Sequence, residues 1–185
     1  MEYDSLEAIY KQIDEVRDAL CKRVEPLTEM QANFAPAAEK WPIAKLVEHL
    51  ALSEELIVAR IDDTLSKAET AGLFVRPAGS SINPVSLDHL KPVASAQTFT
   101  APPRLQATGG RSIPDSIQKL QASRAALHML RPRFEKLELS SVGFPHPVFG
   151  ELNLYQWLLF GGLHEDRHLN QIEAVMASEG FPAGT

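Results

Sequence analysis

The sequence has a single cysteine, Cys21, so the chain cannot form an internal disulfide, and this is typical of proteins in a reducing compartment. Basic residues are in the minority: 18 Lys and Arg stand against 24 Asp and Glu, which gives a net charge of -6. No predicted helix face carries a dense row of Lys or Arg, and this argues against binding to nucleic acid or to an anionic membrane. We therefore expect small molecules or other proteins as partners.

Long apolar runs are lacking as well, and the first residues do not have the pattern expected of a secretory leader. No run of apolar residues approaches the ~20 that a membrane-spanning helix needs. The first residues, Met1–Asp4, are acidic and lead into an amphipathic pattern, whereas a signal peptide begins with basic and then apolar residues. Together with the single cysteine, these features predict a cytoplasmic protein.

Four segments are present in which apolar residues recur every three or four positions, the pattern of amphipathic helices. They cover roughly residues 6–25, 42–65, 113–137 and 153–180. In the last segment Asn153 and Gln156 are spaced for a capping box, and Gly180 is a natural helix stop. No segment shows a sustained alternation with period two. The sequence predicts an all-α four-helix bundle that forms a single domain over residues 1–185.

The stretch from about residue 71 to residue 113 separates the second and third predicted helices and is too long for an ordinary connection. It holds five prolines and Gly109–Gly110, which interrupt helical periodicity. Its local net charge is +3 (four minus one), from Arg76, Lys91, Arg104 and Arg111 against Asp88. We interpret this stretch as a long crossover loop, either a lid that attracts an anionic ligand or a plain solvated connection.

Two histidines, His164 and His168, stand four residues apart in the fourth predicted helix, so both rings lie on one face and can reach a single metal ion. Spacing alone is weak evidence, because random placement of six histidines gives about 0.2 such pairs in a chain of this length. The position of the pair in a buried face is what favours a site. The same face carries Trp157, Phe160, Gly161, Gln171, Ile172 and Val175.

A catalytic divalent site usually has three protein ligands and one open position, so a third ligand is needed. His49, in the middle of the second predicted helix, is the best candidate, because helices in a bundle pack about 8 to 10 Å apart and can share an ion. A buried core histidine is the alternative. The other histidines are weaker candidates for the third ligand. His146 is expected about 16 Å from His164 along the helix axis. His128 is expected beside Arg124 on a solvated face, and His89 in the crossover.

The run His164–His168 also matches the H-E-x-x-H pattern of zinc metalloproteases, in which the glutamate acts as general base. The two residues after Glu165 are charged, although that motif is usually apolar there, and no strand is predicted to hold an extended substrate. A metzincin continuation would also require glycine at Gln171 and histidine at Ala174. We therefore expect Glu165 to form a surface or intersubunit ion pair.

Two stretches of the chain carry a resemblance to the DinB-like superfamily, and the resemblance covers the first, second and fourth predicted helices and their order. They are Trp41–Ile43 leading to Glu48–Leu50, and His146–Gly150 leading to Trp157 and His164–Ile172. The chain departs from the family at Pro42, where serine or threonine is usual. The resemblance implies a four-helix bundle with a long crossover and a divalent metal held by His49, His164 and His168.

Members of that superfamily include bacillithiol S-transferases, mycothiol-dependent maleylpyruvate isomerases and metal-dependent hydrolases. The resemblance implies a metal that activates a bound thiol or water. We favour low-molecular-weight thiol transfer over hydrolysis, with a non-catalytic metal-binding bundle as the third alternative. Gln171 is expected to hydrogen-bond a ligand ring, and Gly161–Gly162 either leaves room at the open position or serves close helix packing. Three imidazoles suit Zn, Ni, Co or Fe, and we expect a homodimer that acts on a small molecule.

Overall fold

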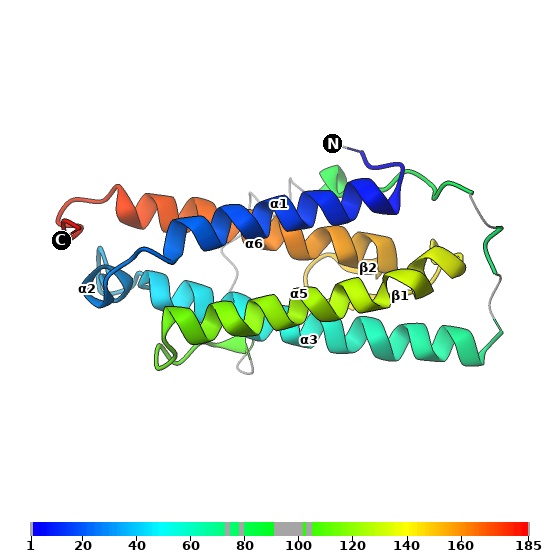
Figure 1. Ribbon diagram of the computed structural model, residues 1–185, viewed down its shortest axis with the longest axis horizontal. Coiled ribbons are helices and arrows are strands. Elements are labelled where there is room, and N and C mark those ends of the chain that lie inside the picture. Colours follow the sequence, from blue (N-terminus) through cyan, green and yellow to red (C-terminus); the bar gives the residue numbers. More distant parts are fainter. Residues whose placement is uncertain (1, 73–74, 78–79, 91–101, 103–104, 185) are drawn as a thin grey trace.

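The computed structural model describes residues 2–72, 75–77, 80–90, 102 and 105–184. Four long helices dominate it (Figure 1): α1 (Leu6–Val24), α3 (Ile43–Thr70), α5 (Ile113–Lys136) and α6 (Leu154–Met176). The shorter elements are helix α2 (Glu29–Ala32), the 3-10 helix η1 (Asp88–Leu90) and the strands β1 (Gly143–His146) and β2 (Gly150–Asn153). The predicted four-helix fold is confirmed. None of the described helices is long and apolar enough to cross a membrane.

Capping side chains define the starts of α5 and α6. Ser112 caps α5, and α6 begins with the predicted capping box. Asn153 Oδ1 accepts from Gln156 N at 2.9 Å, and Gln156 Oε1 accepts from Asn153 N at 3.0 Å. Helix α6 ends at Met176, earlier than predicted, and Gly180 with its φ of +81° lies in the turn that follows.

The four long helices are arranged as two pairs of parallel neighbours. Helix α1 packs along α6 and α3 packs along α5, and contacts between α3 and α6 join the pairs. Helices α1 and α6 run in one direction and α3 and α5 in the opposite one (Figure 1). Because α3 and α5 are parallel, the chain must return along the bundle between them, which accounts for the length of the connection.

The described parts of this crossover contact the bundle at several places. Arg76 N donates to the last residue of α5 at 2.8 Å, and Val85 forms a β-bridge with the residues that precede α1. Leu105 then lies against α3 through its carbonyl oxygen. Two of the four basic residues of the crossover, Lys91 and Arg104, lie outside the described residues.

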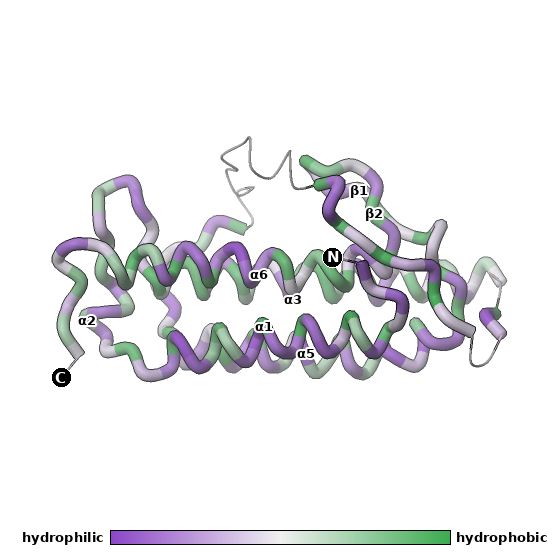
Figure 2. The backbone as a smooth tube through the Cα atoms, turned by 90° about the horizontal axis from the view of Figure 1, so that it is seen from above, coloured by the Kyte–Doolittle hydropathy of each residue, from purple (hydrophilic) through white to green (hydrophobic). Residues whose placement is uncertain are grey.

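A β-hairpin between α5 and α6 contradicts the prediction that the chain has no strands. β1 and β2 pair antiparallel with Phe144 opposite Leu152, and these two side chains are buried. Trp157 fixes the hairpin, because its Nε1 donates to Phe144 O at 2.8 Å and the two rings stack at 4.3 Å. Figure 2 shows the hairpin on the side of α3 and α6, away from α1 and α5. Strands of four residues are too short for their alternation to stand out in the sequence.

Buried apolar side chains form two clusters, one toward each end of the bundle. In α1 one cluster ends at Ile13 and the other begins at Leu20, and in α6 the gap lies between Leu159 and Ile172. The buried residues inside these gaps are largely polar or charged. A polar layer therefore crosses the middle of the bundle, and the candidate site belongs to this layer.

Candidate metal centre

Three histidines from two helices meet at the interface of α3 and α6. One ligand atom from each of His49, His164 and His168 lies within 4.8 Å of the other two. The Nε2 atoms of His164 and His168 are 3.1 Å apart. The His49 ring centre lies 5.3 Å from that of His164 and 5.0 Å from that of His168. The i, i+4 pair and the candidate from the second predicted helix are thus brought together as expected.

Hydrogen bonds on the far side of two rings direct their Nε2 atoms toward the cluster. His49 Nδ1 lies 2.8 Å from Leu105 O, and because a carbonyl only accepts, Nδ1 carries the proton and Nε2 has a lone pair, with Ser53 Oγ 3.5 Å from it. His168 Nδ1 lies 2.7 Å from Gln171 Oε1, which sets the same tautomer. Both bonds are of the kind that orients metal-binding imidazoles in proteins.

Burial keeps the three rings neutral. It lowers the pKa of His168 to about 4 and holds the pKa of His164 well below its usual value. Burial also lowers the pKa of His49, although the bond to Leu105 opposes this. Repulsion from Arg167 acts in the same direction as burial on all three rings. Neutral imidazole is the form that binds a metal, so the rings are ready for it at neutral pH.

The donor set fits a divalent transition metal. Nitrogens bound to a tetrahedral zinc at ~2.1 Å are roughly 3.4 Å apart, and the 3.1 Å between the two α6 histidines is close to this. Within the described chain, no fourth His, Cys, Asp or Glu joins the three. A metal ion held by the three histidines would have three protein ligands and one remaining position, the feature that distinguishes catalytic from closed structural sites.

The other histidines lie outside the cluster. His128 is exposed and pairs with Asp14 at 3.0 Å, and His89 is exposed in η1. His146 lies nearer to His164 than the ~16 Å along the helix axis that the sequence predicts, because the hairpin folds back over the start of α6. Its ring centre lies 4.9 Å from that of Phe160, which stacks on His164 at 5.8 Å. His146 thus contributes to an aromatic wall beside the site.

Glu165 lies in the middle of the bundle, so its predicted surface position is wrong. The side chain is 2% exposed, and its Oε1 accepts from Arg17 at 2.6 Å and from Arg124 at 2.9 Å. Glu54 contacts the same two guanidinium groups. The prediction that Arg124 lies with His128 on a solvated face is also wrong, because Arg124 is buried. A rotation of about 100° from His164 turns Glu165 toward the centre, where α1 and α5 supply these arginines.

We call these four residues, Arg17, Glu54, Arg124 and Glu165, the charge layer. One residue comes from each long helix, and their formal charges sum to zero. Arg17 also donates from Nε to Glu165 Oε2 at 3.1 Å, so both oxygens of Glu165 accept from guanidinium groups. A carboxylate engaged in this way is not available as a general base, which argues against the metalloprotease mechanism.

Of the two crossover arginines that the structure describes, Arg76 lies away from the histidines. Arg76 lies at the far end of the bundle and donates to Glu135 O at 2.9 Å. Along α3 that end is about 31 Å from His49, at 1.5 Å per residue. Arg111 is half-buried beside the segment that contacts α3. Arg167 of α6 is a cation that lowers the pKa of all three rings.

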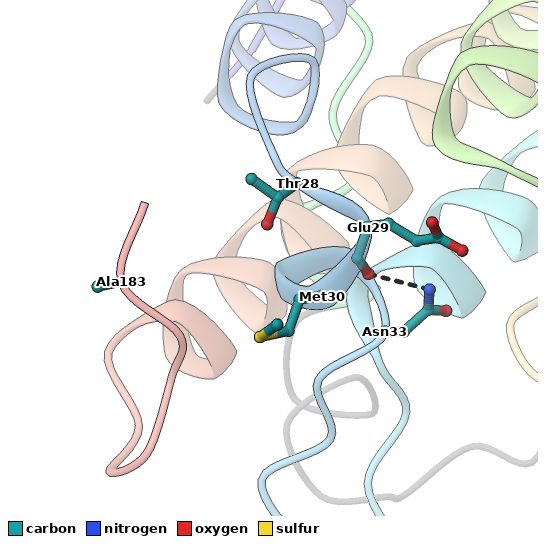
Figure 3. A pocket seen from close by; sticks show the side chains of 5 residues that line it. All are labelled: Thr28, Glu29, Met30, Asn33 and Ala183. Atoms are coloured by element: carbon teal, nitrogen blue, oxygen red, sulfur yellow. Dashed lines mark hydrogen bonds between the residues drawn. The ribbon is translucent and has the colours of Figure 1, made fainter. Parts of the chain in front are cut away.

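A surface hollow elsewhere on the molecule has no part in this site. A pocket of about 550 Å³ lies between α2 and the C-terminal segment and is lined by Met30 and Ala183 (Figure 3). Its other lining residues are Thr28, Glu29 and Asn33. It contains no histidine and no cluster of charges.

The structure thus defines a class: a four-helix bundle with three neutral histidines converging between two antiparallel helices. The family model of the DinB superfamily matches residues 12–172, and the chain belongs to this superfamily. A curated relative is YuaE of Bacillus subtilis (strain 168), an uncharacterized protein that is 27% identical over 167 residues, with 88% of this chain and 93% of YuaE covered.

Two solved structures share the fold. TT2238, described as a four-helix bundle protein, matches with a TM-score of 0.58 and 20% identity, over 91% of this chain and 98% of its own. YfiT from Bacillus subtilis matches with a TM-score of 0.58 and 19% identity, over 92% of this chain and 85% of its own. YfiT is described as a probable metal-dependent hydrolase with an unusual four-helix bundle topology.

Proposed function

We propose that this protein is a divalent-metal-dependent enzyme and that His49, His164 and His168 are the metal ligands. The observation that carries the proposal is the convergence of three neutral imidazoles from α3 and α6, two of them oriented by hydrogen bonds on the far ring nitrogen. Zn, Ni, Co and Fe all suit this donor set. Such an ion keeps its full charge among neutral ligands and lowers the pKa of a bound thiol or water, which makes a nucleophile at neutral pH.

The chain's own residues prepare the space around that position. Phe160 stacks on His164, and His146 packs on Phe160, so this wall excludes water from one side of the site. Arg167 contributes positive charge near the rings, which favours an anionic nucleophile or substrate. Gly161, on the same face of α6, leaves open space, because a Cβ placed there meets no atom within 4 Å.

Low-molecular-weight thiol transfer is our first candidate for the reaction. A thiolate is anionic and soft, and both properties suit a borderline-soft cation with a nearby arginine. We expect the metal-loaded protein, prepared without a His tag, to conjugate a small thiol to an electrophile. The thiols to be tested are bacillithiol, mycothiol, glutathione, coenzyme A and cysteine, and metal-free protein is the control. Metal-dependent turnover of esters or amides, with no conjugation of any thiol, would replace this candidate by hydrolysis.

Hydrolysis is the second candidate because YfiT, which shares the fold, is described as a probable metal-dependent hydrolase. The same three ligands serve both reactions, so the two differ in the nucleophile and the substrate. A bundle that only binds metal would lack turnover in either assay. A homodimer, a cytoplasmic location and a small-molecule substrate complete the proposal, each as a prediction.

Two adjacent glycines of α6 offer a matched test of the open space. A Cβ at Gly162 would lie 2.8 Å from Ile13 Cγ2, so Gly162 serves close packing of α6 against α1. We expect Gly162→Ala to lower the free energy of unfolding by about 1–3 kcal/mol. Gly161→Ala is expected to keep or raise stability by up to ~1 kcal/mol, because alanine favours helix.

The larger change Gly161→Leu fills the open space beside the ligands. We expect it to lower turnover at least tenfold while metal content stays at the wild-type value, measured by elemental analysis and urea denaturation on the same samples. Unchanged turnover in Gly161→Leu would show that the substrate does not use this space.

A further inference from the structure

The residue before His49 holds a backbone segment in place. Glu48 is 4% exposed, and its Oε1 accepts from Thr108 N at 3.3 Å and from Thr108 Oγ1 at 3.1 Å. Its Oε2 accepts from Gly109 N at 2.8 Å. Gly109 has a φ of +78°, a left-handed conformation that glycine adopts without strain, and this lets the turn present its N–H groups to one carboxylate.

The same segment supplies the acceptor for His49. Leu105 O lies 2.8 Å from His49 Nδ1, and Leu105 is only three residues before Thr108. We call Leu105–Gly109 the strap. It therefore contacts two successive side chains of α3, one through a backbone carbonyl and the other through N–H and hydroxyl donors.

The two attachments have different consequences for the site. A carbonyl within hydrogen-bond distance selects the Nδ1–H tautomer of His49 and turns Nε2 toward the other two rings. A loop carbonyl has no fixed position of its own, so something must hold the loop at the correct height along α3. Glu48 is placed to do this, because it binds the backbone of the same strap at a point that cannot move far from Leu105.

We propose that Glu48 is a positioning residue of the metal centre: it anchors the strap, and the strap places the Leu105 carbonyl that orients His49. This inference rests on the proposed metal site. Glu48 touches neither substrate nor ion in this account and acts through Leu105 and His49 alone.

The test compares Glu48→Ala and Glu48→Gln with Ser112→Ala. Glu48→Gln keeps one acceptor oxygen and the size of the side chain, so it guards against failure of the alanine variant to fold. Ser112 caps α5 just beyond the strap, and its loss removes a stabilising bond without touching Glu48 or His49. Cobalt affinity by competition with a chelator, the cobalt visible spectrum and the exchange rate of the His49 Nδ1–H proton in the zinc-loaded protein are measured for each.

We expect the cobalt dissociation constant to rise about 10- to 100-fold in Glu48→Ala and by a smaller factor in Glu48→Gln. The visible spectrum should change and the His49 Nδ1–H proton should exchange faster, whereas Ser112→Ala should match wild type in all three. Wild-type affinity, spectrum and exchange rate in the folded Glu48 variants would overturn the inference alone. Absence of stoichiometric cobalt binding by the wild-type protein would overturn the metal site as well.

Discussion

Replacing any one of His49, His164 or His168 by alanine is expected to abolish stoichiometric metal binding. In the proposed centre each ring supplies one of three donors, and two imidazoles rarely hold a divalent ion tightly. A metal that binds only the folded state stabilises it by about 2.7 kcal/mol at a hundredfold excess over Kd. The three variants should therefore also lose the rise in melting temperature that metal causes in the wild-type protein.

Two other histidines serve as controls for this result. His128 is exposed and pairs with Asp14, and His146 packs in the aromatic wall without joining the cluster. His128→Ala and His146→Ala should bind metal at the wild-type stoichiometry. Elemental analysis after gel filtration measures this directly. Full metal occupancy in His49→Ala would contradict the three-histidine site.

Breaking the charge layer is expected to have the largest effect on stability. Arg17 is 5% exposed and contacts both Glu165 and Glu54, so Arg17→Met leaves two buried carboxylates that share Arg124 as their remaining guanidinium partner in the charge layer. Removal of one partner from a buried ion pair costs about 3–5 kcal/mol. Because small domains have a free energy of unfolding of only about 5–15 kcal/mol, this variant should lie close to unfolding at room temperature.

An exposed ion pair between α1 and α6 provides the matched control. Arg23 pairs with Glu173 at 2.7 Å, and both side chains are nearly half exposed. Arg23→Met should cost less than about 1 kcal/mol, because water and salt screen an exposed pair. Urea denaturation of the two metal-free variants, followed by circular dichroism, compares the losses. Equal losses would show that the charge layer does not stabilise the fold.

The long helices were predictable because each buries an apolar stripe that repeats every three to four residues. The capping box at Asn153 is a local signal of the same kind, since it depends on two side chains three positions apart. The hairpin was not predictable in this way. It depends on Trp157 reaching back to Phe144, a contact between elements that no local pattern contains.

In the candidate site too, local sequence patterns predict some residues and miss those that depend on contacts between elements. His164 and His168 could be found from their spacing, and His49 from its place in a neighbouring helix and from the family resemblance. Glu165 and Arg124 were misplaced because charged side chains are rarely buried, and their partners are on other helices. The strap was not predictable, because every residue has a backbone carbonyl and the sequence does not indicate that the carbonyl of Leu105 binds His49.

The most direct test of the account is X-ray absorption spectroscopy of the metal-loaded protein, with and without a small thiol. The account predicts three imidazole nitrogens at ~2.0–2.1 Å and one exchangeable ligand, which a thiol replaces by sulfur at ~2.3 Å from zinc. A thiol that leaves the spectrum unchanged while water remains exchangeable would favour hydrolysis. A metal with fewer than three imidazole ligands, or one closed by a fourth protein ligand, would contradict the proposed centre.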